Sequence, residues 1–350
     1  MTAANGHGAG APPPASRPTR RWDRIAVVAV VVVVLAVLVA PRAFPRTDVP
    51  ESLPGPEPTT TTTTPPAEAV TCENPTASLR PAGPATQEVA PASYMDSIRQ
   101  RGRLRVGVSA TNLLFSTVNP FTGELEGFDA DIAREVAIAL FGDAEPAHIE
   151  FVVIPQTDRV SVLKDGEVDM VVSTFSITCA RLQDIDFSSE YFTSGQRLLV
   201  PEGDEAVSIT MDTLAADAQQ GEDRGRVCAA EGSTSIGVIR DWQPQPHAVA
   251  PTTHAECLAL LQQGEIDAVS TDDTLLAGFV AQDPNVEIVG PRLTTENYGL
   301  GLPPDKEEWV RYVNAVLEDV RSSGRWDALY AYWLSEALGV QTAPAAVYSD

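Results

Sequence analysis

The sequence predicts an α/β fold made of two related lobes. Strand-like and helix-like segments alternate from residue 104 to residue 173, which is typical of a parallel sheet covered by helices. The phrase LKDGEVDMVVST begins at Leu163 and returns as LQQGEIDAVST at Leu261. A chain of 350 residues is also longer than one average domain. We therefore expect two lobes of related design, each with its own sheet.

The N-terminal segment predicts a membrane anchor. Residues 1–24 hold four arginines and one aspartate, and the next sixteen, Ile25–Ala40, are all apolar. Positive charge before an apolar run keeps the N-terminus in the cytoplasm. We therefore expect a cytoplasmic basic tail over residues 1–24, a transmembrane signal anchor over 25–41, and the folded part of the chain on the outer side of the cell membrane. A cleaved signal peptide is the alternative, and Pro41 argues against it.

Residues 42–92 predict a disordered tether. This segment is rich in proline, threonine, alanine and glutamate, and positions 59–64 are all threonine. Such a composition cannot bury enough apolar surface to fold. As a coil, a segment of this length spans about 40 Å, and as extended polyproline II it reaches up to roughly 150 Å.

Charge and motif content exclude several classes of function. Setting aside the four arginines and one aspartate of residues 1–24 leaves 20 basic and 47 acidic residues, a surface that repels nucleic acid. No GxSxG, HExxH or P-loop motif occurs in the sequence. We therefore expect no nucleic-acid partner, no catalytic residue and no cofactor.

The folded part is expected to start near Tyr94. In GFDADIAREVAIALFG, Ile132, Val136 and Leu140 recur at helical spacing and Gly142 ends the helix. Each copy of the repeated phrase marks a helix end where a glycine turns directly into a strand. The expected strands are 104–108, 151–154, 168–173, 226–230 and 266–270. The expected helices are a short one ending at Gly102 and those over 127–142, 157–164, 234–242 and 255–263.

The four cysteines predict two disulfides. An even number in an exported chain favours disulfides, and four cysteines allow three connectivities. Cys228 and Cys257 lie in the second unit, whereas Cys72 and Cys179 flank or lie in the first, so we expect Cys72–Cys179 and Cys228–Cys257. Each would stabilise the fold by roughly 3–5 kcal/mol in the loop-entropy model. A metal site at His254-x-x-Cys257 would need further ligands that the neighbouring sequence lacks, so we expect no metal.

Small polar residues gather where the expected strands end, at Ser173–Ser176, Ser233–Ser235 and Thr271–Asp273. Ligands of open α/β sheets bind outside the carboxyl ends of strands. Backbone N–H groups at helix N-termini hold anions well, so Ser233–Ser235 suits a carboxylate. Ordinary helix capping by serine and threonine is the alternative.

Three motifs resemble the signatures of family 3 extracellular solute-binding proteins, which serve amino-acid ABC transporters. They are GFDADIA (127–133), SITCARLQDIDFSSEYF (176–192) and GEIDAVSTDDTLLAG (264–278). The likeness covers roughly residues 94–335, and the sequence is similar to the actinobacterial glutamine/glutamate-binding type.

This resemblance implies a two-lobed periplasmic-binding-protein fold of type II with a ligand cleft between the lobes. Lobe 1 would comprise 93–199 and 295–335, lobe 2 would comprise 200–294, and a C-terminal tail would follow over 336–350. The chain would cross between lobes near Val200–Gly203 and Gly290–Asn297.

The resemblance also implies residues that bind a free amino acid. Arg181 matches the arginine that grips the ligand α-carboxylate with two parallel bonds, and Asp272 matches the acid that takes the α-ammonium. The remaining matches are Thr174 and Ser176 in lobe 1 and Ser233 and Thr234 in the closing turn of lobe 2.

The side-chain pocket points to an acidic ligand. Arg159 matches an arginine of family members with acidic ligands, and a solvated helix arginine is the alternative. Gln156 stands where glutamine-binding relatives place an aromatic residue, and Ser109 replaces their first-lobe aspartate. These departures favour glutamate or aspartate, with asparagine or glutamine tolerated. Asn112 and Phe115 are candidate pocket walls.

Three functions are compatible with these features. The leading one is capture of an acidic amino acid for an ABC importer by a monomeric protein. The second is an amino-acid sensor domain that signals to a membrane partner. The third is an enzyme similar to cyclohexadienyl dehydratases, for which Glu190 or Glu231 would be the general acid. We expect no enzyme, because no aromatic substrate pocket is indicated.

Overall fold

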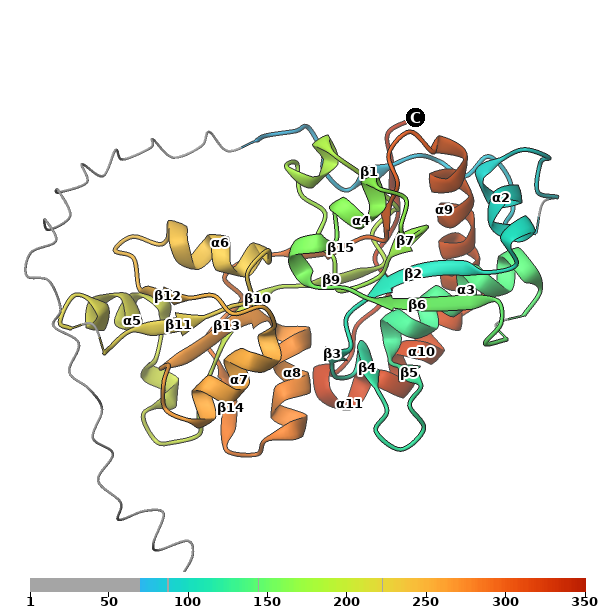
Figure 1. The fold of residues 1–350 in the computed structure, drawn as a ribbon. Helices are drawn as coiled ribbons and strands as arrows, with labels where there is room; N and C mark the ends of the chain where they lie inside the picture. The colour runs from blue at the N-terminus through green and yellow to red at the C-terminus, as the bar shows by residue number, and fades with distance from the viewer. Residues whose placement is uncertain (1–69, 87, 144, 222) are drawn as a thin grey trace, which may run out of the picture. The chain divides into compact units, whose positions relative to one another are not determined.

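The structure, a computed structural model, describes residues 70–350 apart from 87, 144 and 222. In this part of the chain, two five-stranded sheets form the centres of two α/β lobes (Figure 1). The predicted fold class is confirmed. The predicted cytoplasmic tail, the predicted anchor over 25–41 and most of the predicted tether lie outside the described residues. Among the residues that are described, none of the helices has the length and apolar character needed to cross a membrane.

The sheet of lobe 1 is mixed. Its strand β2 (Leu104–Val108) is parallel to both of its neighbours, β6 (Ile149–Val153) and β7 (Met170–Val171), as the alternation of strands and helices predicts. The strand β16 returns from the far end of the chain and runs antiparallel to β7 and β8. In sheet order the strands are β6 (Ile149–Val153), β2 (Leu104–Val108), β7 (Met170–Val171), β16 (Gly301–Leu302) and β8 (Asp186–Phe187).

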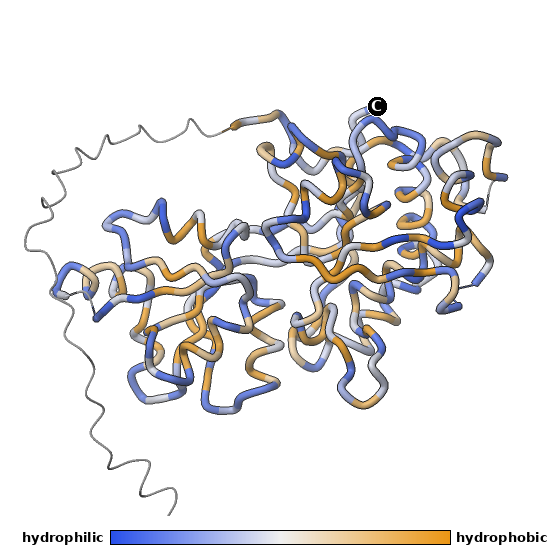
Figure 2. Tube along the Cα trace, viewed as in Figure 1, coloured by the Kyte–Doolittle hydropathy of each residue, from blue (hydrophilic) through white to orange (hydrophobic). Residues whose placement is uncertain are grey.

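Helices cover both faces of this sheet. One face carries the larger apolar core, and the turn after β6 closes the other face. Figure 2 shows hydrophobic segments along the central strands and alternation of hydrophobic and hydrophilic segments in the helices. The helices of lobe 1 are α2 (Tyr94–Arg101), α3 (Phe128–Phe141), α4 (Ser161–Lys164), α9 (Glu307–Ser322), α10 (Arg325–Trp333) and α11 (Ser335–Leu338). A small sheet of β3 (Thr111–Asn112), β4 (Ser116–Val118) and β5 (Leu125–Glu126) precedes α3.

The helix expected over 157–164 is interrupted. A 3₁₀ turn, η1, covers Gln156–Asp158 and α4 begins only at Ser161. The Arg159 side chain donates from Nε to the Gln156 carbonyl at 3.1 Å, and the Ser161 hydroxyl donates to the Asp158 carbonyl at 3.1 Å. Side chains thus occupy carbonyl groups that a continuous helix would need for its own backbone bonds.

Lobe 2 repeats the design of lobe 1. Its strands β12, β11 and β13 are parallel to one another, β10 runs antiparallel to β13, and β14 runs antiparallel to β10. In sheet order the strands are β12 (His247–Val249), β11 (Arg226–Cys228), β13 (Ala268–Asp272), β10 (Gln196–Pro201) and β14 (Val286–Val289). The helices are α5 (Met211–Ala218), α6 (Thr234–Asp241), α7 (His254–Gln262) and α8 (Asp273–Gln282), with short 3₁₀ turns η2 (Arg181–Gln183) in lobe 1 and η3 (Ala206–Ser208) in lobe 2.

The repeated phrase has the same structural role in both lobes. Gly166 and Gly264 follow a helix with φ of 68° and 69°, in the left-handed region that glycine adopts most easily. Asp169 then accepts the backbone N–H of Arg105 at 2.8 Å, and Asp267 accepts that of Arg226 at 2.8 Å. Each aspartate therefore fixes the start of the first parallel strand of its lobe, which explains why the phrase occurs twice.

Two antiparallel strands link the lobes. They are β9 (Phe192–Ser194) and β15 (Glu296–Tyr298). The first crossing predicted at Val200–Gly203 is wrong, because Gln196–Leu199 already pair with β13 of lobe 2. Leu198 and Leu199 are buried on opposite faces of that sheet, which holds the strand in lobe 2.

Both ends of the described chain are fixed to lobe 1. The strand β1 (Ala77–Ser78) pairs in parallel with β17 (Val347–Tyr348). Asn314 of α9 donates to the Ser78 hydroxyl at 2.9 Å and to the Leu79 carbonyl at 2.7 Å. The predicted disordered tether over 42–92 therefore ends too late, because β1 lies within it. The predicted C-terminal tail over 336–350 likewise includes the ordered strand β17. Their ends are ordered by backbone pairing that their compositions do not reveal.

Two disulfides with the predicted connectivity are present. Cys228–Cys257 lies in the core of lobe 2, between β11 and α7. Cys72–Cys179 joins the start of the described chain to the segment that leads into Arg181. This second bond fixes the N-terminal segment to Cys179, two positions before Arg181.

Candidate functional site

The candidate site is a polar cavity between the two lobes. All seven residues that the sequence nominates for ligand binding line it, and only about 10 Å³ of space remains inside. The lining residues are Gln156, Arg159, Thr174, Ser176, Arg181, Ser233, Thr234, Ser235, His254, Thr271, Asp272 and Leu275. Segments far apart in sequence thus converge on one small volume.

The lobe 1 wall depends on a buried carboxyl group. Thr174 has a φ of 43°, a left-handed conformation that β-branched residues rarely adopt. Asp129, from the GFDADIA motif, accepts the Thr174 N–H at 2.8 Å and the Tyr191 hydroxyl at 2.6 Å. Burial raises the pKa of Asp129 to about 7, although both hydrogen bonds oppose the shift. Asp129 therefore positions the turn that carries Thr174 and Ser176.

Two arginines of lobe 1 reach the same point in the cavity. Arg159 is 3% exposed, so it is not the solvated helix arginine that the sequence left open. Its guanidinium donates to the Ser173 carbonyl at 3.2 Å and to the Gly232 carbonyl of lobe 2 at 3.1 Å. Arg181 also donates to the Gly232 carbonyl, at 3.2 Å. Both guanidinium carbons lie over the Phe175 ring, 4.4 and 4.6 Å from its centroid.

These arginines face each other without a carboxylate partner. Within the described residues, no carboxylate oxygen lies within 4.0 Å of either guanidinium. Burial and the neighbouring Arg181 charge lower the pKa of Arg159 well below its usual value, and burial lowers that of Arg181 to about 10. Two adjacent cations of this kind need an anion for charge balance.

Asp272 provides the opposite charge on the lobe 2 side. It ends β13, is 5% exposed, and accepts the Tyr298 hydroxyl through Oδ2. Its Oδ1 is buried and has no hydrogen-bond partner. Burial, together with the nearby Glu296 carboxylate, raises the pKa of Asp272 to about 7. An ammonium group at Oδ1 would satisfy this oxygen and restore the ionised form.

The first turn of α6 forms the third side of the cavity. Ser233 caps this helix, because its hydroxyl accepts the Ile236 N–H at 3.2 Å. The Thr234 hydroxyl donates to Glu296 of the linker at 2.9 Å. Gly232, just before the helix, leaves room for closure: a Cβ there would lie 3.0 Å from the Thr157 Cα of lobe 1. Capping and ligand binding are thus compatible at this turn, since capping uses the Ser233 side chain and leaves the first N–H groups of the helix free.

Several residues of the site did not emerge from the sequence. His254 lines the cavity beside Gln156 and Thr271, although from the sequence His254 was considered only as a metal ligand, with no metal expected there, and Thr271 was named only within the polar strand end Thr271–Asp273. Phe115 is not a pocket wall, because it packs in the lobe 1 core with its ring 5.3 Å from Phe192. Asn112 is buried behind Thr174, with 3.5 Å between the Asn112 amide nitrogen and the Thr174 hydroxyl oxygen. Whether such residues line the cavity depends on the directions of their side chains, which a comparison of sequence motifs does not give.

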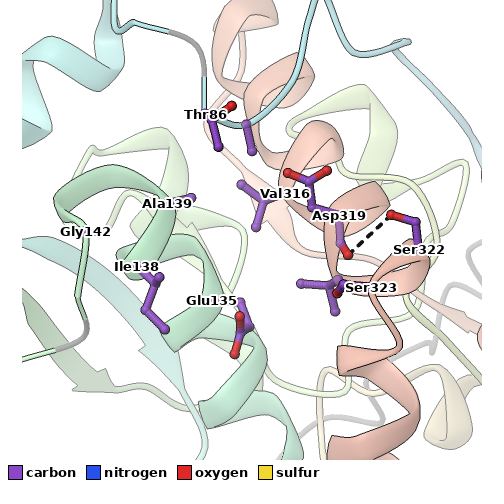
Figure 3. A pocket seen from close by; sticks show the side chains of 11 residues that line it. Thr86, Glu135, Ile138, Ala139, Gly142, Val316, Asp319, Ser322 and Ser323 are labelled. Atoms are coloured by element: carbon purple, nitrogen blue, oxygen red, sulfur yellow. Dashed lines mark hydrogen bonds between the residues drawn. The ribbon is translucent and has the colours of Figure 1, made fainter.

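A second hollow lies away from the cleft, between α3 and α9 of lobe 1 (Figure 3). Ile138, Ala139 and Val316 contribute apolar side chains, and Glu135 and Asp319 contribute carboxylates. Glu135 is already paired with Arg325 at 2.7 Å. This hollow brings together no opposite charges that lack partners, so the cleft remains the candidate site.

Comparison with known proteins identifies relatives of this chain. A model of the bacterial extracellular solute-binding proteins, family 3, matches residues 104–336. The ABC transporter glutamine-binding protein GlnH of Bacillus subtilis (strain 168) is 32% identical over 240 residues, which cover 69% of this chain and 84% of that protein. The glutamate-binding protein GluB of Corynebacterium glutamicum is 30% identical over 249 residues, covering 69% of this chain and 80% of that protein.

A solved structure extends the comparison to the fold. The ancestral amino acid-binding protein AncCDT-1, a precursor of cyclohexadienyl dehydratase, is 30% identical with a TM-score of 0.61 and covers 69% of this chain and 99% of that one. The two lobes and their linkers are those of a type II periplasmic amino-acid-binding protein. The chain therefore belongs to family 3 of the bacterial extracellular solute-binding proteins.

Proposed function

We propose that this protein binds an acidic amino acid, glutamate or aspartate, between its lobes and delivers it to an ABC importer. The observation that carries the proposal is the pair of arginines, Arg159 and Arg181, which converge in the cleft without a carboxylate partner among the described residues. One carboxylate would balance one cation, and a dicarboxylic ligand would balance both.

The ligand groups can be assigned to the cavity walls. The α-carboxylate would lie between Arg181 and the first turn of α6, where a guanidinium and helix N–H groups both donate to it. The α-ammonium would contact the unpartnered Oδ1 of Asp272. The side-chain carboxylate would then extend toward Arg159 and Gln156.

Binding of an amino acid in this cavity requires the two lobes to move apart. A cavity of about 10 Å³ cannot accept an amino acid from solution while Gly232 stays bonded to both arginines. The two linker strands, β9 and β15, are the segments about which the lobes would separate. Ligand would enter the open form and stabilise the closed one.

The relatives support an amino acid as the ligand. Among them are proteins that bind glutamine and glutamate. The two glutamates nominated for the enzymatic alternative are engaged elsewhere: Glu190 accepts from the Asn297 amide at 3.0 Å in the linker region, and Glu231 pairs with Arg240 at 2.7 Å. Neither glutamate lines the cleft.

Thermal unfolding of the full chain with single amino acids tests the proposal. At about 100 times its Kd, a ligand adds roughly 2.7 kcal/mol to the free energy of unfolding. For a folded part of this size, that raises the Tm by on the order of 5–11 °C. Glutamate or aspartate should give this shift, glutamine and asparagine a smaller one, and arginine none. A shift with arginine equal to that with glutamate would contradict the charge argument.

We also propose that residues 25–41 anchor the chain in the cell membrane with the two lobes outside. The apolar run and the preceding arginines support this location. Protease added to intact cells should remove the lobes, and high salt should not release the chain from membranes. Detergent extraction followed by co-purification should recover an ABC permease subunit. Recovery of a non-transporter membrane protein instead would favour the sensor function.

A further inference from the structure

His254 joins the two lobes through both of its ring nitrogens. It is the first residue of α7 in lobe 2 and is 3% exposed. Nδ1 lies 2.9 Å from Nε2 of Gln156 in lobe 1, and Nε2 lies 2.9 Å from the Thr271 hydroxyl in lobe 2. The imidazole therefore spans the closed cleft beside the residues proposed to hold the ligand side chain.

This arrangement is suited to a neutral ring. The Gln156 amide nitrogen can only donate, so Nδ1 accepts and the ring proton resides on Nε2, which donates to Thr271. A second ring proton would point at that amide nitrogen. Turning the Gln156 amide would relieve this clash, but the new positive charge would still be buried beside the Arg159 guanidinium.

The surrounding charges oppose protonation in the closed form. Burial and the Arg159 charge lower the pKa of His254 to about 3. From the elements packed on α7, β13 contributes Asp272, whose own pKa is raised, and β10 contributes Arg197, whose side chain is bonded to the Gly290 carbonyl. The strand β3 of lobe 1 contributes no charged residue, and on α7 itself Glu256 is exposed and bonded to Thr253.

Opening the cleft removes the cause of this shift. Gln156 and Arg159 both belong to lobe 1, so separation of the lobes takes them away and exposes His254 to water. The ring would then regain a pKa near the ordinary value of about 6.5. A proton therefore binds the open form much more tightly than the closed form, and acid favours the open form.

We propose that His254 is a proton-controlled latch: the cleft closes on its ligand only while the imidazole is neutral. The inference rests on the proposed binding of an amino acid in this cleft. It adds that the protein holds its ligand at neutral pH and releases it in acid. His254 acts through Gln156 and Thr271, so it is a positioning residue.

The test is the pH dependence of glutamate binding by the full chain between pH 5.0 and 8.0, measured by calorimetry. The latch predicts that Kd rises roughly tenfold from pH 7.5 to pH 5.5, with a limiting slope of about one decade per pH unit. In His254→Asn, the amide oxygen can accept from Gln156 but cannot titrate. Whatever its affinity at pH 7.5, this variant should lose most of the acid effect, so that the ratio of its Kd at pH 5.5 to its Kd at pH 7.5 falls well below the roughly tenfold expected for the original chain.

Two comparisons make the result specific. Asp272 titrates in both proteins, so only the difference between their pH profiles reports on His254. His148→Asn is the matched control, because His148 pairs with Asp143 in lobe 1 outside the cavity, and it should keep the original profile. Parallel profiles for His254→Asn and the original chain would overturn the latch. Absence of binding by the original chain at pH 7.5 would instead overturn the proposed function and the latch together.

Discussion

Replacing Arg181 with alanine is expected to weaken strongly the binding of every amino acid that the protein takes. The substitution removes the cation assigned to the α-carboxylate, which all amino acids share. Truncating one member of a buried, hydrogen-bonded charge pair costs about 2–5 kcal/mol, which corresponds to a loss of roughly 30-fold to 4,000-fold in affinity. Calorimetry with glutamate and glutamine would measure both losses, which should be similar.

The unliganded Arg181→Ala protein should remain folded. Burial is the main cause of the lowered pKa of Arg159 and the neighbouring Arg181 charge is the second, so removing that charge relieves a repulsion that offsets the lost hydrogen bonds from Arg181 to the Ser176 and Gly232 carbonyls. Its Tm without ligand should therefore be unchanged or slightly higher. Arg181→Lys is the control, since it keeps the charge but loses the planar two-bond geometry, and it should bind with intermediate affinity. A large drop in the unliganded Tm would show that Arg181 is structural.

The sequence predicts the lobes well because each is built from local patterns. The GE[VI]D phrase carries a helix end, a glycine turn and a strand start within a few residues, and the structure repeats all of them. The paired ends, β1 and β17, are two-residue strands that lie 270 positions apart (Ala77 and Val347). Neither has a periodicity of its own, so only the folded lobe reveals the pairing. The crossing into lobe 2 is equally hidden, because the apolar residues at 198–201 would suit either core.

In the candidate site, too, the residues that lie in local motifs were predictable from the sequence, whereas the contacts between the lobes were not. Arg181 and Asp272 lie in motifs whose local context points to them, and the structure places both on the cavity wall. The Gln156–His254–Thr271 chain of hydrogen bonds was not predictable, because it joins two lobes and Gln156 lies 98 positions from His254. Only closure of the lobes brings these residues together. Interactions that exist in one conformational state leave no short-range pattern.

Replacing Arg159 with methionine is expected to change the ligand preference. Methionine has a similar length but no charge, so it removes the cation assigned to the ligand side-chain carboxylate. Hydrogen bonds to charged groups contribute about 1.5–3 kcal/mol, so glutamate and aspartate should lose roughly 10-fold to 150-fold in affinity. Glutamine and asparagine carry no side-chain charge and should lose much less. Kd values for the four ligands, compared pairwise, measure the change in preference.

This second substitution also separates a role in binding from a role in folding. Arg159 donates to carbonyl groups of Ser173, Gln156 and Gly232, so its loss leaves three acceptors with one fewer donor each. A purely structural arginine would therefore lower the unliganded Tm and weaken glutamate and glutamine binding equally. Arg159→Lys should restore part of the preference for dicarboxylates, because the charge returns without the full set of donors. Equal losses for glutamate and glutamine in Arg159→Met would place the side-chain carboxylate elsewhere in the cleft. A selective loss would assign the second cation to ligand specificity.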